Sequence, residues 1–454
     1  MAAIVTNKFR VNNAAKFKQS ITDAANSVYV AIGKSDAWSD SLIDFTDADA
    51  PTPQDQQKDE RNFYNDMMAM KLLTAGDVTH VIPRYNWVSG NAYAAWDDRD
   101  SDIYDKAFYV ITDEFKVYKC IATGPGASVI QPTQTNINEP VAESDGFLWK
   151  FMFTTQAADA DRFVTNNFIP VKTVVIPAGG SVGDLTTDDQ TQYSGQLAAE
   201  VGTNGAIYHI QVTNGGSGFT SKPTITIDGD GTGAVVNAGD ITLTSQSITS
   251  IKLTSFGQDY SNAVVNITGG GGIGATAYAV LTPDLGHGGD PVAELGAFFV
   301  TVNSKLDGDE GNGDFVVDND FRQVGVVMNP FTYGTTSIST SGTLGALSSF
   351  TLSGHSGFTE DDYITGATSS AIAYIDAYDN ATGELKYHQN DKTGYGVFEV
   401  SETITGSLGG TGTINTLNNP EVERFSGQVL FIESRAPINR AATQIEDIKV
   451  IIEF

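Results

Sequence analysis

The sequence predicts a mainly β fold built from many short strands. The chain has 47 glycines among its 454 residues, and only 18% of its residues are charged. Short runs of Thr, Ser, Val and Ile alternate with clusters of Gly, Asn and Asp, a pattern typical of strands joined by turns. A 41-residue internal repeat is the third observation. Because a chain of this length exceeds what one core usually supports, we expect two to four domains.

Helical patterns are confined mostly to the first 75 residues. A first helix is predicted over Asn13–Ala25, because its apolar residues recur at helical spacing. A strand is predicted over Val28–Ile32. A second helix is predicted to start with Thr52 as N-cap and Pro53 as its first residue, and to run as far as Leu73.

The internal repeat is the clearest sign of domain organisation. The segment Ile207–Phe219 is echoed by Ile248–Tyr260, and Ile210 aligns with Ile251. Each unit has the pattern strand, aromatic turn, strand, Gly-rich turn, strand. Such a unit cannot bury its own apolar face, so we expect the two copies to pack together into a small β-domain.

A second region rich in Gly, Thr and Ser runs from about residue 334 to residue 417. Three strands are predicted in it, over Tyr374–Tyr378, Leu385–His388 and Val397–Val400. The turn between the first two contains Asp379–Gly383. We expect this region to form another separately packed β-module.

The charge balance excludes several classes of function. The chain has 26 basic and 55 acidic residues, a net charge of −29, which would repel nucleic acids and anionic membranes.

No apolar run has the length of a membrane span, and the N-terminus lacks the apolar stretch of a signal peptide. The single cysteine, Cys120, excludes an intrachain disulfide and is interpreted as a small buried side chain in a strand over Val117–Ile121.

Two motifs suggest ligand sites, and a plainer interpretation is favoured for both. Gly269–Gly274 spells GxGxxG, but a strand-like segment follows where a dinucleotide site needs a helix, so we interpret it as a turn. The loop Asp307–Asp314 concentrates carboxylates and invites a calcium hypothesis. Its spacing departs from a calcium loop at Gly311, so a solvated acidic loop is preferred, as it is for Asp97–Asp102 and Glu360–Asp362.

Motifs of known enzymes are missing from the sequence. There is no HExxH, GxSxG or GxxxxGK[ST] pattern. The histidines are scattered over apparent strands and turns: His80, His209, His287, His355 and His388. We therefore assign no catalytic, cofactor-binding or metal-binding residue, and no cofactor or small-molecule substrate is expected.

Short motifs recur in a fixed order along several separated segments. The first are Ile4–Arg10 and Gly33–Trp38, and the aromatic segment Asp145–Phe153 follows. The other internal motifs are Val81–Arg84 with Trp87, Phe321–Gln323 with Gly325 and Val326, Asn329–Pro330, and Ser426–Gly427. The C-terminal motifs, Glu433–Ile438 and Gln444–Phe454, are the most telling. In content and order these motifs resemble the gene-product-eight-type baseplate wedge subunits of T-even-like contractile-tail bacteriophages.

The resemblance implies a β-sandwich core with a few N-terminal helices, a homodimer, and burial among other wedge subunits in the virion tail baseplate. It implies no catalytic residue. The core would comprise residues 1–175, 286–332 and 421–454. The stretch 176–285, with the repeat, and the stretch 333–420 would then be inserted Gly-rich β-modules.

Structural roles are predicted for two sets of side chains in the resembling segments. We expect four aromatic residues to fill the sandwich: Trp38, Trp87, Trp149 and Phe454. Four arginines each lie beside strand-like residues, where a guanidinium can pair with a carboxylate inside the chain or contact another subunit. They are Arg10, Arg84, Arg322 and Arg435.

The function predicted from these observations is structural and non-enzymatic: a baseplate wedge subunit that dimerises and holds neighbouring wedge proteins in register. A second hypothesis is a carbohydrate- or receptor-binding tail protein, in which Tyr260, Tyr374 and Tyr378 stack on sugars. A third is a β-rich enzyme that degrades polysaccharides.

Overall fold

The computed structural model describes residues 4–39, 41–43, 46–47, 49–200, 204–307, 314–360 and 362–454. The predicted mainly β fold is confirmed, with 41% strand and 14% helix. The chain divides into two compact units, which are described separately. Unit 1 comprises Met1–Ala15, Thr79–Thr301 and Ile451–Phe454, and unit 2 comprises Lys16–Val78 and Val302–Val450. Within the described ranges, no helix has the length and apolarity needed to span a bilayer.

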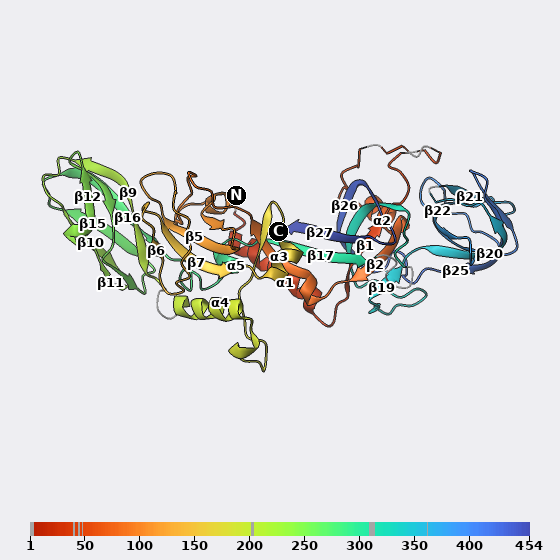
Figure 1. The fold of residues 1–454 in the computed structure, drawn as a ribbon, viewed down its shortest axis with the longest axis horizontal. Helices are drawn as coiled ribbons and strands as arrows, with labels where there is room; N and C mark the ends of the chain where they lie inside the picture. Colours follow the sequence, from red (N-terminus) through yellow and green to blue (C-terminus); the bar gives the residue numbers. More distant parts are fainter. Residues whose placement is uncertain are drawn as a thin grey trace. The chain divides into compact units, whose positions relative to one another are not determined.

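The helices are short and spread further along the chain than predicted (Figure 1). The α-helices are α1 Asn7–Thr22, α2 Gln57–Asn65, α3 Ala157–Phe163, α4 Thr187–Ala198 and α5 Pro291–Glu294. The 3-10 helices are η1 Ala75–Asp77, η2 Ile103–Asp105, η3 Val182–Asp184 and η5 Ala238–Asp240. The first predicted helix is therefore confirmed with an earlier start, but the confinement of helices to the first 75 residues is wrong.

The strands run through both units. In unit 2 and at its boundaries they are β1 Val28–Gly33, β2 Met67–Leu72, β17 Phe299–Asp307, β18 Asp320–Met328, β19 Thr343–Gly345, β20 Ser348–Ser356, β21 Tyr363–Gly366, β22 Ile372–Asp379, β23 Glu384–His388, β24 Thr403–Gly406, β25 Thr411–Asn418, β26 Gln428–Asn439 and β27 Ile445–Glu453. In unit 1 they are β3 Val78–Pro83, β4 Tyr109–Ile111, β5 Lys116–Ala122, β6 Val141–Ala142, β7 Leu148–Thr154, β8 Phe168–Val171, β9 Ile207–Ser217, β10 Thr224–Gly229, β11 Thr232–Val235, β12 Ile241–Thr244, β13 Ser247–Ile251, β14 Ser255–Gln258, β15 Ala263–Thr268 and β16 Ile273–Leu281.

Unit 2 contains a five-stranded sheet in the order β19-β2-β1-β18-β26. Its central strand β1 is the apolar run predicted as a strand, and every residue of β1 is buried, as expected for a strand covered on both faces. The second predicted helix is wrong at both ends. It begins at Gln57 after the N-cap Gln56, not at Pro53 after Thr52, and it ends at Asn65, because Met67–Leu72 instead pairs with β1 as the strand β2. Tertiary pairing has overridden the helical preference of its methionines.

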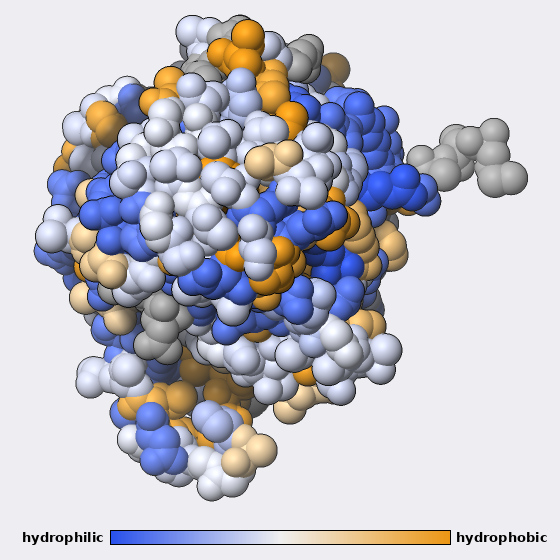
Figure 2. All heavy atoms as spheres, turned by 90° about the vertical axis from the view of Figure 1, so that its right-hand side faces the viewer, coloured by the Kyte–Doolittle hydropathy of each residue, from blue (hydrophilic) through white to orange (hydrophobic). Residues whose placement is uncertain are grey.

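The six strands β20–β25 of unit 2 close into a barrel in the order β20-β23-β22-β21-β24-β25. The barrel has its own apolar core, which includes Phe350, Ile364 and Ile414. Two of its strands, β22 and β23, were predicted, but the strand predicted over Val397–Val400 is wrong: it is irregular, and Val397 is 80% exposed. Figure 2 shows the outer face of this region as mostly pale, with apolar colour only in small separate patches, which agrees with its Ser, Thr and Gly content.

Unit 1 contains the four-stranded sheet β4-β5-β7-β6. Trp149 on β7 is fully buried in its core, and Cys120 on β5 is buried as predicted, which raises the pKa of its thiol. Trp38, Trp87 and Phe454 are only partly buried, so the prediction that they fill the core is wrong for these three.

The repeat region forms a module of eight strands, β9–β16, in unit 1 (Figure 1). Its core is made of residues from both copies of the repeat, including Ile210, Ile251, Phe219 and Tyr260. The expected packing of the two copies is confirmed. The first four residues of the GxGxxG segment form a turn between β15 and β16, as predicted, and its last two residues begin the strand β16.

Candidate functional site

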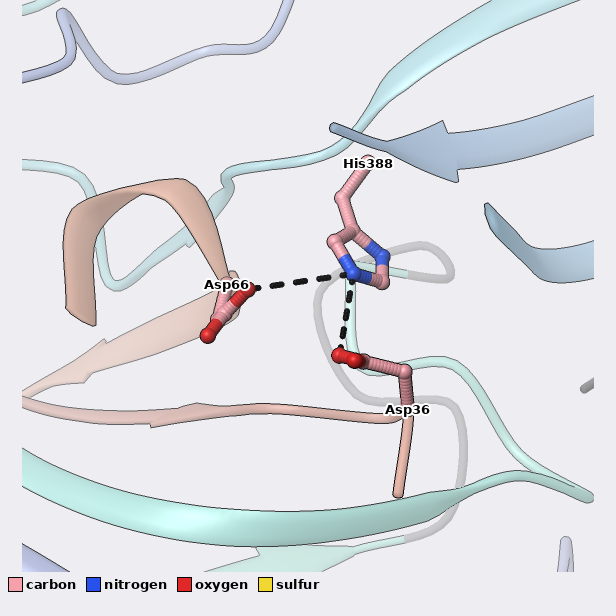
Figure 3. A group of neighbouring side chains, drawn as sticks. All are labelled: Asp36, Asp66 and His388. Atoms are coloured by element: carbon pink, nitrogen blue, oxygen red, sulfur yellow. Dashed lines mark ion pairs between the residues drawn. The ribbon is translucent and has the colours of Figure 1, made fainter. Parts of the chain in front are cut away.

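A group of buried charged side chains gathers in unit 2 around His388 (Figure 3). Asp36 follows β1, Asp66 lies between α2 and β2, and His388 ends β23 of the barrel. All three are buried, and one ligand atom from each lies within 4.8 Å of the others. The His388 Nε2 atom lies 3.3 Å from Asp36 Oδ1 and 3.9 Å from Asp66 Oδ1.

The backbone brings the two aspartates together through a close approach at Gly33. A Cβ atom at Gly33 would lie 2.6 Å from the carbonyl oxygen of Asp66, so only glycine leaves room for this contact. The next residue, Lys34, takes a positive φ of 67° and donates its backbone N–H to the same carbonyl at 2.7 Å. This turn points the Lys34 side chain back toward both carboxylates.

Lysines contact the same carboxylates as the imidazole. Lys34 Nζ lies 2.7 Å from Asp36 Oδ2 and 3.5 Å from Asp66 Oδ2, and Lys392 Nζ also pairs with Asp36. The other ring nitrogen of His388 lies 2.9 Å from Asp376 Oδ2 on β22. Three cationic side chains, His388, Lys34 and Lys392, therefore face three carboxylates in a closed network, which we call the His388 network.

The electrostatics of this network hold His388 in its charged form. Burial alone would lower the pKa of His388, but Asp376 and Asp36 raise it to about 10. Burial would raise the pKa of Asp36, and the His388 hydrogen bond and Lys34 outweigh it and lower that pKa. The pKa of Asp66 is raised by burial, because Asp36 rather than Asp66 receives the closest cations.

The set Asp36, Asp66 and His388 has the residue types of a metal site, but its surroundings do not fit one. A histidine ligates a metal through a neutral ring nitrogen, whereas this imidazole is held protonated between carboxylates. The ammonium group of Lys34 occupies the space beside both aspartates. The geometry fits an ion-pair network that joins the barrel to the loops of the five-stranded sheet.

A polar cavity of about 280 Å³ borders the His388 network. Lys34, Asp66 and Lys392 contribute to its wall, together with Trp38, whose ring lies 5.6 Å from Lys34 Nζ. The buried amide oxygen of Gln323, also on the wall, has no hydrogen-bond partner within the described part of the chain. Three lysines and three aspartates line this cavity, so it does not favour a ligand of one charge: Lys34, Lys58, Lys392, Asp59, Asp66 and Asp391.

A second buried charged group lies in unit 1. Lys119 Nζ on β5 lies 2.6 Å from Glu294 Oε1 on α5 and 3.6 Å from the ring centroid of Trp96. His287 Nδ1 lies 3.2 Å from the same Glu294 oxygen. Burial lowers the pKa of Lys119 to about 8 and that of His287 to about 4, whereas Lys119 outweighs burial at Glu294 and lowers its pKa to about 2.

The four arginines singled out in the sequence differ in the groups that they contact. Arg322 makes a bidentate pair with Asp47, at 2.7 and 2.9 Å, and Arg435 pairs with both oxygens of Glu433 at 2.9 Å, as predicted. Arg10 pairs with Glu453 and donates to the carbonyl of Phe454. Arg84 instead donates to the side chain of Asn86 and the carbonyl of Thr165.

The other candidate residues of the sequence do not assemble into a ligand site. Most of the acidic loop, residues 308–313, lies outside the described residues, and so does residue 361 in the segment 360–362. In the segment 97–102, Asp100 pairs with Lys106 and Asp97 accepts a hydrogen bond from Tyr278. Tyr260 and Tyr374 are 7% and 3% exposed, so the prediction that they stack on sugars is wrong.

Sequence reasoning missed both buried networks. Two signals were available: Lys119 lies within the apolar run of β5, and the titratable residue His388 ends the strand β23. Such residues are rarely buried without partners. The partners come from distant parts of the chain, so the sequence does not reveal them.

The fold and these networks define a class of protein: a β-rich chain in which buried charges join structural elements. The family of bacteriophage T4 Gp8 has a model that matches residues 3–124 of this chain. This match confirms the resemblance seen in the sequence and supports a gp8-type baseplate structural protein located in the virion tail baseplate. In a search of curated proteins, none matches the chain.

Proposed function

We propose that this chain is a wedge subunit of a phage tail baseplate that forms a homodimer and holds neighbouring wedge proteins in register. The observation that carries the proposal is the match of residues 3–124 to the Gp8 family. The subunit acts mechanically and not as an enzyme. During tail contraction it moves largely as a rigid body while its interfaces rearrange.

Buried ion-pair networks support a mechanical role. In unit 2, the His388 network fastens the barrel to the loops that follow β1 and precede β2. Removing one member of such a network leaves an uncompensated buried charge, which is strongly destabilising. These ion pairs therefore transmit a force applied to the barrel to the five-stranded sheet, so that the force is not absorbed by bending of the connecting segments.

The segments 176–285 and 333–420 are insertions in this proposal, added to a core that dimerises without them. Deletion of residues 200–283 from the full chain is expected to leave a folded dimer, measured by light scattering coupled to size-exclusion chromatography. A monomer or an aggregate after this deletion would contradict the insertion proposal.

The location and stoichiometry are tested by quantitative mass spectrometry of purified virions and isolated baseplates. The wedge proposal expects enrichment in the baseplates at a copy number divisible by six. Enrichment with the tail fibres at a multiple of three would reject it and favour a receptor-binding protein.

A further inference from the structure

The two copies of the repeat are related by a local two-fold axis inside the β9–β16 module. Ile210 and Ile251 occupy the same position in the two copies and pair directly with each other. The strands β10 and β15, also equivalent in the repeat, pair antiparallel along their whole length. Antiparallel pairing of two equivalent strands places a two-fold axis between them, as in a symmetric dimer interface.

The remaining pairings obey the same symmetry. Thr232 of β11 pairs with Gln258 of β14, and Ile273 of β16 pairs with Ser217 of β9. Each residue of the second pair lies 41 positions from its counterpart in the first, the spacing of the repeat. The third strand of each copy therefore adds to the first strand of the other copy.

The strand ladders join one half of the module to the other. The first half contains β9–β12 (Ile207–Thr244), and the second contains β13–β16 (Ser247–Leu281). The ladders are β9–β16, β9–β13, β10–β15, β11–β14 and β12–β13, and each of them crosses between the halves. Among the described residues of the module, no ladder joins two strands of one half, so each half needs the other for its backbone hydrogen bonds.

Side chains of the two halves also pack against each other reciprocally. A Cβ atom at Gly272 of the second half would lie 2.4 Å from the Phe219 ring of the first half. A Cβ atom at Gly231 of the first half would lie 2.4 Å from the Tyr260 ring of the second half. Each half thus supplies both an aromatic ring and the glycine surface that receives the partner's ring.

One tight turn links the halves covalently. Ser245 and Gln246 connect β12 to β13, with φ angles of 52° and 62°. A two-residue turn with two positive φ angles normally contains Asn-Gly or a similar pair, because other residues are strained there. Opening this turn into one continuous strand would relieve the strain, and strained short hinges favour exchange of elements between chains.

We propose that the β9–β16 module links two copies of this chain by exchanging halves. The first half of one chain pairs with the second half of the other, and the reverse. The partner is a second copy because the complement of each half is present on every copy. Exchange competes with closure within one chain, so it increases where copies are held close together.

An engineered disulfide shows whether the two paired halves of a module belong to one chain or to two. Thr226 and Asn266 lie opposite each other in the β10–β15 ladder, and the natural Cys120 is buried. In the full-length variant T226C/N266C, closure gives a disulfide within one chain, and exchange gives a disulfide-linked dimer. Denaturing electrophoresis without reductant separates these products. It also dissociates any non-covalent dimer of the core, so the result does not depend on the proposed function.

Three hinges are compared in this cysteine background: the natural hinge, S245N/Q246G, and deletion of residues 245 and 246. Each protein is oxidised after incubation and after refolding at increasing concentration. We expect linked dimers that increase with concentration for the natural hinge. About tenfold fewer are expected with Asn-Gly, which relieves the strain of the closed turn. The deletion should give mainly linked dimers, because it prevents closure.

The proposal is overturned if the natural hinge gives only disulfides within one chain at every concentration. Equal amounts of linked dimer from the natural hinge and from S245N/Q246G would also overturn it. If the deletion variant does not fold, the comparison of the other two hinges decides.

Discussion

The imidazole of His388 and the carboxylate of Asp376 lie 2.9 Å apart on the neighbouring strands β23 and β22 of the barrel. The other nitrogen of the same ring faces Asp36, which follows β1 of the five-stranded sheet. One protonated ring therefore joins the barrel to the sheet, which makes the stability of unit 2 dependent on pH.

The packing of the barrel on the five-stranded sheet is expected to become less stable in alkaline solution. The folded-state pKa of His388 is raised to about 10, above the ordinary value of 6.5. A raised pKa means that the folded state binds the proton more tightly, so the contribution is complete below about pH 6.5 and is lost as the pH rises toward 10. Hydrogen exchange of β22 and β23 between pH 6 and pH 10, corrected for the intrinsic exchange rate, measures this loss.

The control for this pH effect is His388→Gln, which keeps polar contacts but cannot carry the charge. It should be less stable at pH 6 and should show a flatter pH profile. An unchanged alkaline loss in this variant would assign the effect to another group.

Removing the charge of Glu294 is expected to destabilise unit 1. Glu294→Gln leaves Lys119 buried without its ion-pair partner, and breaking a buried pair costs about 3–5 kcal/mol. The double variant K119M/E294Q should recover part of this loss, because it removes the uncompensated charge. Local unfolding free energies of β5, from hydrogen exchange, provide the measurement.

The exposed pair of Lys8 and Asp284 offers a matched control in the same unit, since both side chains are more than four-fifths exposed. Asp284→Asn should change the stability of β5 little. A double variant no more stable than Glu294→Gln would argue against charge as the cause.

Glycines beneath the repeat aromatics are expected to be intolerant of a methyl group. Gly272→Ala and Gly231→Ala each place a Cβ atom 2.4 Å from an aromatic ring, and overpacking of this kind costs about 1–3 kcal/mol. Gly239→Ala is the control, because a Cβ atom there meets nothing within 4 Å. If Gly239→Ala destabilised the module as much, loss of glycine itself and not the ring contact would be responsible.

Arg322 and Arg435 both make bidentate pairs, but lysine should be tolerated at only one of them. The Arg322 side chain is 6% exposed and also donates to the buried carbonyl of Ser35, so Arg322→Lys leaves this buried acceptor unsatisfied and is expected to cost about 1–3 kcal/mol. Arg435 is 23% exposed and Glu433 39%, so water can replace the lost hydrogen bond in Arg435→Lys. Urea unfolding of the two variants compares them, and equal losses would contradict the role of burial.

The sequence by itself determined the mainly β class, the strand β1 and the pairing of the two repeat copies. These features depend on local pattern: apolar runs, turn residues and a fixed spacing, all of which act over short distances along the chain. The family resemblance was also visible locally, in short motifs such as Gly33–Trp38.

Tertiary structure alone decided the conformation of Met67–Leu72 and the partners of the buried charges. The methionine-rich segment suits a helix, but β1 offers a strand edge on which it is buried. His388 meets Asp36 across more than 350 positions of sequence, and no local pattern encodes a contact that depends on how the barrel packs. The sequence also showed that the repeats match, but only the fold showed that every ladder of the module crosses between them, because antiparallel pairing depends on the direction of the strands in space.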